Sequence, residues 1–183
     1  MKPLLRFRGV TCRRGGRILF EALDLAIAPG EALHLTGPNG CGKSSLIRLA
    51  AGLLQQEQGS IERAELTLAD DALALDRELP LRRALQFWGG DTGRAMDLLG
   101  LAHLADVPVR LLSTGQAKRA TLARVAASPA PLWLLDEPLN GLDSDAVSRL
   151  EALVETHLAR GGGVLAASHG ALGGSWAKLE LGA

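Results

Sequence analysis

The stretch "GPNGCGKSS", from Gly37 to Ser45, constrains this chain more than any other, because it follows the pattern G-x-x-x-x-G-K-[ST]. Glycines allow successive backbone N–H groups to point inward around an anion, and a helix that starts beside them adds its positive end. Apolar "GEALHLT" precedes the loop and "KSSLIRLAAGLL" follows it, which predicts a strand and then a helix. A plain glycine turn is the alternative, but this context favours a phosphate-binding loop.

The pattern of the loop indicates a nucleotide. Lys43 is expected to reach the β- and γ-phosphates, and the hydroxyl of Ser44 is expected to bind Mg²⁺. The loop residues expected to contact the nucleotide are Gly37, Pro38, Asn39, Gly40, Cys41, Gly42, Lys43, Ser44 and Ser45. Cys41 lies near Lys43 and a helix N-terminus, which both favour a thiolate, while the simpler interpretation is a small side chain that fills space.

The rest of the chain alternates between strand-like and helix-like stretches. "APLWLLDEP" and "GGGVLAASH" are apolar runs of strand length, and "GQAKRATLARVAAS" and "DSDAVSRLEALVETHLARG" have helical patterns. This alternation predicts an α/β fold with a parallel sheet. The leucine-rich stretch "LPLRRALQFWGG" belongs to an expected helical insert. We therefore predict one domain over 1–183, with a helical subdomain at about 77–125.

Composition excludes several classes of protein. Apolar residues make up 47% of the 183 residues, enough for a folded core, and 20 basic residues balance 20 acidic ones. Zero net charge gives no basis for bulk binding of nucleic acid, so no nucleic-acid partner is expected. No apolar run approaches the roughly 18 residues of a membrane helix. The two cysteines form no CxxC pattern, which indicates a reducing compartment.

Two acids close the strand "LWLLDEP". In an open parallel sheet, ligands bind at the carboxyl ends of the strands, where Asp136 is expected to hold Mg²⁺ directly or through water. Glu137 adds a second carboxylate beside a triphosphate, which is unfavourable unless it has a function. Orienting or deprotonating the attacking water is such a function.

A second helix start, in "LLSTGQAKRA", has features of an anion site. Ser113 and Gln116 fit a capping box, which explains both residues locally. It does not explain Gly115, which weakens the first helical turn and allows a close approach to the helix N-terminus.

The motifs "GPNGCGKSS", "LSTGQ", "LLDEP", "LNGLD" and "ASHG" occur in an order that resembles ABC-type ATPases over essentially the whole chain. The resemblance implies a P-loop NTPase fold of the ABC ATPase type, with a mainly parallel sheet, a small antiparallel β region and a helical insert. It implies ATP and Mg²⁺ as ligands, with Ser44 and Asp136 at the metal. Glu137 then corresponds to the catalytic acid of the family, and His169 to its switch histidine, in contact with the γ-phosphate.

The same resemblance assigns the second helix start. Ser113, Thr114, Gly115 and Gln116 correspond to the signature motif, which in this family covers the ATP held by the other subunit of a dimer. Asp143 lies in the D-loop. A second ATPase subunit, in a homodimer, is therefore an expected partner.

"APLWLLDEPLNGLD" and "LVETHLARGGGVLAASH" more narrowly resemble the CcmA type, the ATP-binding subunits of the haem exporter of cytochrome c maturation. This resemblance implies integral membrane subunits as partners and a peripheral location at the cytoplasmic face of the bacterial inner membrane. An ATPase for another cargo and a non-hydrolysing, ATP-gated assembly module are the alternatives.

Two positions depart from the family pattern. The family has an aromatic residue before "GG" to stack on adenine, and this chain has Arg14, whose guanidinium can also stack. The glutamine of the family's glutamine loop is absent from "LTLADDALALD", where Asp70 and Asp71 are the candidates for its place.

The neighbouring aromatic residues Phe87 and Trp88 admit two interpretations. They contact a membrane subunit, or they form the core of the helical insert, since large aromatic side chains are usually buried.

Overall fold

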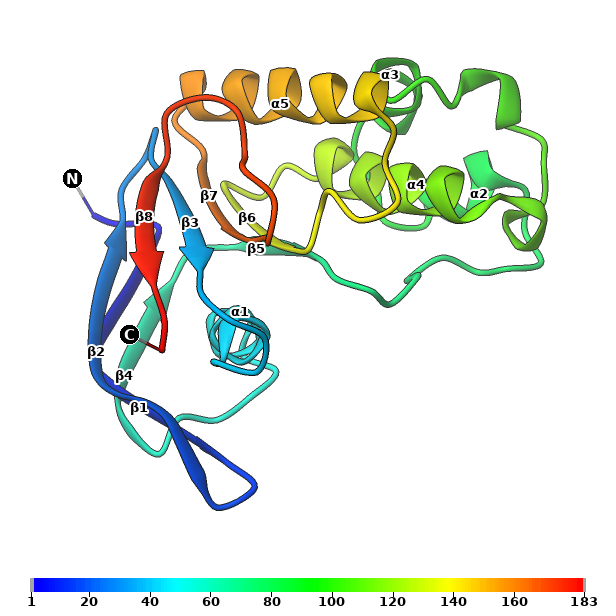
Figure 1. Cartoon of the computed structure of the whole chain (residues 1–183). Coiled ribbons are helices and arrows are strands. Elements are labelled where there is room, and N and C mark those ends of the chain that lie inside the picture. Colours follow the sequence, from blue (N-terminus) through cyan, green and yellow to red (C-terminus); the bar gives the residue numbers. More distant parts are fainter. Residues whose placement is uncertain (1, 183) are drawn as a thin grey trace.

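The computed structural model describes residues 2–182 and contains two sheets, with helices on either side of the larger one (Figure 1). The antiparallel sheet has the order β2-β1-β4, formed by β1 (Leu5–Arg14), β2 (Arg17–Ile27) and β4 (Gln58–Arg63). The parallel sheet has the order β5-β6-β7-β3-β8, formed by β3 (Ala32–Thr36), β5 (Leu66–Ala69), β6 (Leu132–Asp136), β7 (Gly163–Ala167) and β8 (Ala177–Glu180). The predicted fold class is confirmed.

Successive side chains of β6 point to opposite faces of the sheet, into two separate hydrophobic cores. All five of its residues are buried, as an apolar strand with both faces covered requires. Leu132 and Leu134 point into a core shared with β1 and α1 (Lys43–Ala51). Trp133 and Leu135 point into the other core, which is shared with helices on the opposite face.

Helix α1 lies between the two sheets, and its buried leucines contact both. The opposite face of the parallel sheet is covered by α4 (Thr114–Ala127) and α5 (Ser144–Ala159). The predicted helical stretch holds α2 (Leu81–Gln86), α3 (Thr92–Leu98), the short 3₁₀ turns η1 (Ala102–Leu104) and η2 (Val109–Leu111), and most of α4. These elements lie on the side away from the antiparallel sheet (Figure 1). Their separate subdomain status stays a prediction.

Membrane-crossing helices are absent from the described residues, since none of their helices combines sufficient length with sufficient apolar character.

A stacked pair of rings joins α5 to β6. The rings of Trp133 and His157 lie 3.9 Å apart between centroids, at an angle of 14°. The Nε2 atom of His157 lies 3.2 Å from the carbonyl oxygen of Pro131, which can only accept a hydrogen bond, so Nε2 carries the proton. Burial lowers the pKa of His157 below its usual value, although hydrogen bonds to backbone carbonyls oppose this effect.

The lowered pKa of His157 predicts a loss of stability in mild acid. The unfolded chain binds this proton more readily than the folded one, so the stabilisation is complete above the unfolded pKa of about 6.5 and is lost as the pH falls below it. The substitution His157→Phe keeps an aromatic ring against Trp133 but removes the titration. Urea unfolding between pH 7.5 and pH 5 should show a smaller decline in the free energy of unfolding for the variant. Parallel declines would contradict the prediction.

Candidate functional site

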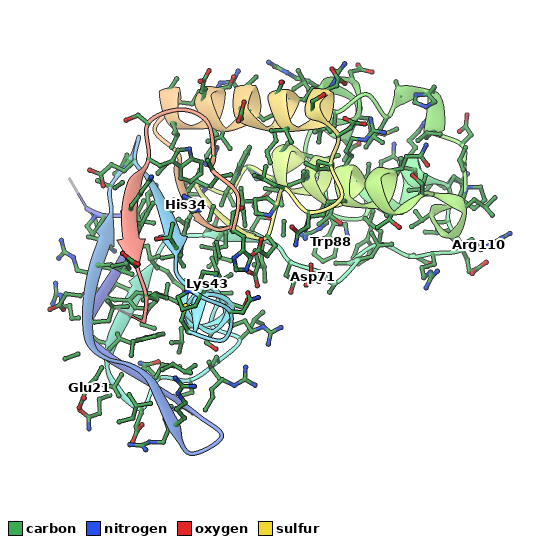
Figure 2. All side chains as sticks on the ribbon, viewed as in Figure 1. Glu21, His34, Lys43, Asp71, Trp88 and Arg110 are labelled. Atoms are coloured by element: carbon green, nitrogen blue, oxygen red, sulfur yellow. The ribbon has the colours of Figure 1, made fainter. Side chains whose placement is uncertain are left out.

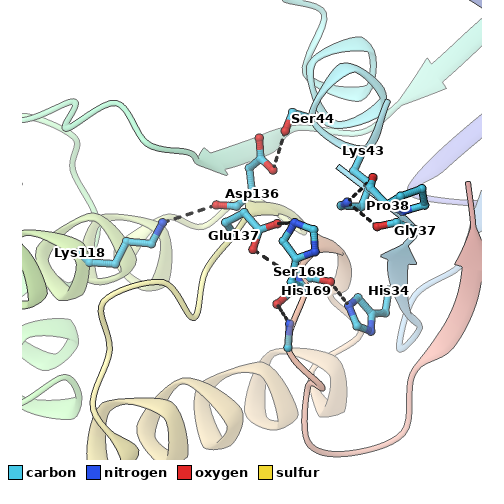
Figure 3. A network of polar contacts seen from close by, with 11 residues as sticks. His34, Gly37, Pro38, Lys43, Ser44, Lys118, Asp136, Glu137, Ser168 and His169 are labelled. Carbon is cyan, nitrogen blue, oxygen red and sulfur yellow. Dashed lines mark hydrogen bonds and ion pairs between the residues drawn. The ribbon is translucent and has the colours of Figure 1, made fainter. Parts of the chain in front are cut away.

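The glycine loop lies between β3 and α1, as the sequence predicts. Gly37 and Gly42 have φ angles of +133° and +113°, which side chains disfavour, and a Cβ atom on Gly37 would collide with the carbonyl of Leu181. The buried ammonium of Lys43 lies inside the loop, where Nζ donates to the carbonyl oxygens of Gly37 at 2.7 Å and Pro38 at 3.1 Å (Figure 3). The loop therefore holds a cation next to the free N–H groups that begin α1.

Ser44 and Asp136, far apart in the sequence, meet at the carboxyl end of β6. The hydroxyl of Ser44 donates to Oδ1 of Asp136 at 3.1 Å (Figure 3). Burial raises the pKa of Asp136, with repulsion from Asp71 and Glu137 adding to it, while the hydrogen bond from Ser44 lowers it. A hydroxyl and a carboxylate are oxygen ligands of the kind Mg²⁺ takes alongside phosphate oxygens, so this pair fits the expected metal.

Residues 2–182 contain no group of three His, Cys, Asp or Glu side chains suited to a metal ion. A cation at Ser44 and Asp136 would therefore draw its other ligands from phosphates and water, as magnesium at nucleotides does.

Glu137 has a strained backbone and a constrained carboxylate. Its φ angle is +47°, a conformation that costs a non-glycine residue about 1–3 kcal/mol and that concentrates at functional sites. Its backbone N–H donates to the carbonyl of Ala167 at 2.8 Å. Its Oε2 accepts from the backbone N–H of His169 at 3.4 Å, and its Oε1 lies 3.5 Å from Nε2 of the same histidine. The β6 and β7 ends are thus tied together at this carboxylate.

A cavity of about 320 Å³ brings these groups to one place. Its lining comes from the glycine loop, β2, and the segments after β6 and β7: Leu19, Asn39, Gly40, Gly42, Lys43, Ser44, Ser45, Glu137, Asn140 and His169. A cavity lined by backbone N–H groups, a lysine, a hydroxyl and a carboxylate is suited to a polyphosphate and an attacking water molecule.

Within the described lining of this cavity, neither Arg14 nor the signature residues Ser113–Gln116 are found. Arg14 ends β1, opposite Arg17 at the exposed tip of the β1–β2 hairpin. The β2 side chain that lines the cavity is that of Leu19, which lies close to Gly42. Sequence reasoning missed Leu19, because nothing marks one leucine of a strand as lining a site.

The start of α4 has the capping box that the sequence predicts. The hydroxyl of Ser113 accepts from the N–H of Gln116 at 3.3 Å, and the amide oxygen of Gln116 accepts from the N–H of Ser113 at 2.9 Å. A Cβ atom on Gly115 would lie 2.9 Å from the carbonyl oxygen of Gly141. The close approach of these two backbone segments therefore requires a glycine at position 115, independently of any anion at the helix start. Asp143 caps α5, accepting from the N–H of Ala146 at 2.8 Å.

Cys41 is buried, with 8% of its surface exposed, and it packs in the same core as Leu35 and Leu181. Its Sγ atom lies 3.0 Å from where a Cβ atom of Gly37 would sit. This environment favours the space-filling interpretation over an accessible thiolate. Cys12 is also buried.

Lys118 is a further charged residue near the site that sequence reasoning missed. Its Nζ lies 3.5 Å from the backbone carbonyl oxygen of Asp136 (Figure 3). Burial lowers the pKa of Lys118, while the charges of Asp71, Asp136, Glu137 and Asp70 oppose this. In the sequence, Lys118 is marked only as a lysine within an alanine-rich helical stretch.

The segment after β5 lies at the same sheet edge. Asp70 and Asp71 line a second cavity of about 280 Å³ together with Lys118. Oδ1 of Asp70 accepts from the N–H of Ala72, while the charge of Asp71 is the strongest of those that act on Lys118. Both acids therefore remain candidates for the place of the missing glutamine.

Comparisons with known proteins place the chain in a family. Residues 20–140 match the family described as "ABC transporter". The chain is 57% identical to the cytochrome c biogenesis ATP-binding export protein CcmA of Sphingopyxis alaskensis, over 94% of this chain and 93% of that protein. It is 58% identical to the CcmA of Novosphingobium aromaticivorans, over 87% of this chain and 85% of that protein.

Solved structures support the same fold. The chain superposes on an ATP-binding subunit of an ABC transporter with a TM-score of 0.87 at 22% identity, covering 98% of this chain and 88% of that one. A putative ABC transporter ATP-binding protein from Pyrococcus furiosus gives a TM-score of 0.82 at 20% identity, covering 97% and 96%. At these identities the structures inform on fold alone. On the sequence matches, this chain belongs to the ABC transporter family and, within it, to the cytochrome c biogenesis ATP-binding export proteins of the CcmA type.

Proposed function

We propose that this chain hydrolyses ATP to drive an ABC transporter that exports haem for cytochrome c maturation. One observation carries the hydrolysis: Lys43, Ser44, Glu137 and His169 line a single cavity, with Asp136 hydrogen-bonded to Ser44 beside it. Family membership supports an ABC-type ATPase, and the name of the relatives supports a role in cytochrome c biogenesis.

The reaction follows from the positions of these groups. Lys43 and the N–H groups at the start of α1 bind the phosphates, and Ser44 and Asp136 would hold Mg²⁺, which would neutralise phosphate charge. Glu137 orients a water molecule and accepts its proton while the water oxygen bonds to the γ-phosphorus. The bond from that phosphorus to the bridging oxygen breaks, which leaves ADP and phosphate. His169 steadies the carboxylate of Glu137 and contacts the γ-phosphate.

A second copy of the chain completes each site in this proposal. Ser113–Gln116 begin a helix of 14 residues with a satisfied cap, yet they are not among the residues that line the cavity of the same chain. A helix N-terminus attracts an anion, so the homodimer supplies this group to the ATP of the partner. Asn140 and Asp143 lie in the loop that contacts Gly115, so in this proposal they lie at the same interface between the two copies.

The membrane subunits bind, in our proposal, at the end of α2. Phe87 is 82% exposed and Trp88 is 46% exposed, and both line a cavity of about 420 Å³ with Leu73 and Leu79. Trp88 is held in place, because its Nε1 donates to the carbonyl of Ala74 at 2.9 Å and the guanidinium of Arg124 lies 4.7 Å above its ring. Figure 2 marks Trp88 beside the segment after β5. An anchored, exposed aromatic pair favours docking over burial in the insert.

The location follows from these partners. A chain held by integral membrane subunits lies peripherally at the cytoplasmic face of the bacterial inner membrane, where ATP is supplied. In this proposal the membrane subunits bind the cargo. The assignment of haem as that cargo is therefore supported by the similarity to proteins named for cytochrome c biogenesis.

The substitution Glu137→Gln tests the hydrolysis. The amide keeps the shape of the side chain and loses the base, so ATP binding should persist while the turnover rate falls at least about a hundredfold. Phosphate release and the affinity for a fluorescent ATP analogue measure the two effects. A turnover near that of the unchanged chain would remove Glu137 from the mechanism. Absence of turnover in the unchanged chain, with its membrane partners present, would favour a non-hydrolysing module.

The substitution Lys43→Ala serves as the matched comparison. It removes a charged donor from the phosphates, so the dissociation constant for ATP should rise by roughly tenfold to a hundredfold. Unchanged affinity would show that the loop does not bind phosphate through this lysine.

The substitution Phe87→Ser tests the docking surface. Loss of an exposed anchor should weaken binding to the membrane subunits by roughly tenfold or more, with ATP affinity unchanged. Leu53→Ser is the control, because Leu53 is 66% exposed in the loop after α1, away from α2. Co-purification from detergent extracts measures the binding. Equal effects of the two substitutions would contradict a specific surface at Phe87.

A further inference from the structure

His34 is a buried histidine on β3, between β7 and the edge strand β8 of the parallel sheet. It lies in β3, opposite Ala166 of β7 and Lys178 of β8, and only 4% of its surface is exposed. Its ring meets the ring of Trp176 edge to face, with 6.2 Å between centroids. A buried imidazole in a strand is unfavourable unless its polar atoms are paired, so this position has a reason beyond packing.

The side chain of His34 makes one well-defined hydrogen bond. Its Nε2 lies 3.0 Å from the backbone carbonyl oxygen of Ser168, the residue that follows β7 (Figure 3). A carbonyl oxygen can only accept, so Nε2 carries the proton and donates. Ser168 is itself 2% exposed, and its hydroxyl accepts from the N–H of Gly170 at 3.1 Å, which shapes the turn.

The peptide group that His34 holds is the one that contacts Glu137. Its C=O belongs to Ser168 and binds His34, and its N–H belongs to His169 and donates to Oε2 of Glu137 at 3.4 Å. Because a peptide group is planar and rigid, fixing its oxygen also fixes the direction of its N–H. The side chain of His169 faces the other oxygen of Glu137 at 3.5 Å, so the same turn addresses both carboxylate oxygens.

We propose that His34 is a positioning residue for hydrolysis, which holds the Ser168–His169 peptide so that its N–H and the imidazole of His169 orient the carboxylate of Glu137. This inference rests on the proposed role of Glu137. His34 itself is buried in the sheet and lies outside the described lining of the phosphate cavity, so it acts through the turn and not on the nucleotide.

Three substitutions separate this role from simple filling of space. His34→Gln places an amide N–H near the position of Nε2 and should keep most of the turnover. His34→Asn has a shorter amide that does not reach Ser168, and His34→Leu has no donor. Both should lower kcat by about tenfold while KM for ATP stays within about twofold, since the effect is on orientation and not on binding.

His157→Gln is the control for loss of a partly buried histidine. His157 also pairs with a backbone carbonyl, that of Pro131, but it lies at the opposite end of β6 from Glu137. It should change the melting temperature without a selective fall in kcat. All variants are prepared in the full chain, assayed with the membrane subunits, and compared for thermal unfolding so that an unfolded variant is recognised.

A spectroscopic measurement gives a second readout that does not depend on activity. In ¹H–¹⁵N spectra, the backbone amide of His169 should shift in His34→Leu and His34→Asn and return towards its original position in His34→Gln. The imidazole of His34 should be the Nε2-protonated tautomer.

Three outcomes would overturn the proposal. One is equal kcat for the Leu and Gln variants in folded protein, the second is a loss expressed in KM, and the third is an unmoved His169 amide. If Glu137→Gln leaves turnover intact while the His169 amide still responds to His34, the catalytic role of Glu137 fails and the structural link stands. The two results are therefore distinguishable.

Discussion

The parallel pairing of β6, β7 and β3 is the constraint on which the site depends. The register sets Asp136 opposite Ala167 and Leu35 opposite the same residue from the other side, so three strands end at nearly one level. Each strand then delivers its following residues to that edge: the glycine loop after β3, Glu137 after β6, and Ser168 and His169 after β7. A register slip in β6 would move its buried side chains to the wrong core and remove Asp136 from Ser44.

Much of this arrangement can be predicted from the sequence because the strong signals are local. Glycines around a lysine, a wholly apolar strand that ends in acids, and a serine spaced for a capping box each have a physical meaning within ten residues. The order of these motifs adds the family and hence the fold. Glu137 and Lys43 were expected in one site on that basis, and the structure brings both to the same cavity.

The residues that sequence reasoning missed act across the sheet or between layers. Leu19 reaches the cavity because β2 passes beside Gly42, and Lys118 reaches β6 because α4 packs against that sheet edge. His34 differs from its strand neighbours in polarity, but its partner lies 134 residues away. Gly115 has no local explanation, since it weakens the first turn of α4, and nothing in the sequence indicates its close contact with the carbonyl of Gly141. Such contacts depend on topology, which no short pattern contains.

The contact between Gly115 and Gly141 has a consequence for motion. Two backbone segments touch there without a side chain between them, so neither can yield by changing rotamer. The first turn of α4 and the loop before α5 must then shift together, or their backbones must separate. In a dimer in which the start of each α4 meets the nucleotide of the other subunit, a movement of α4 at that nucleotide would also move the loop before α5 of the same chain. That loop follows Glu137 and lies beside the site for the chain's own nucleotide. Coupling of the two sites would then require no flexible relay.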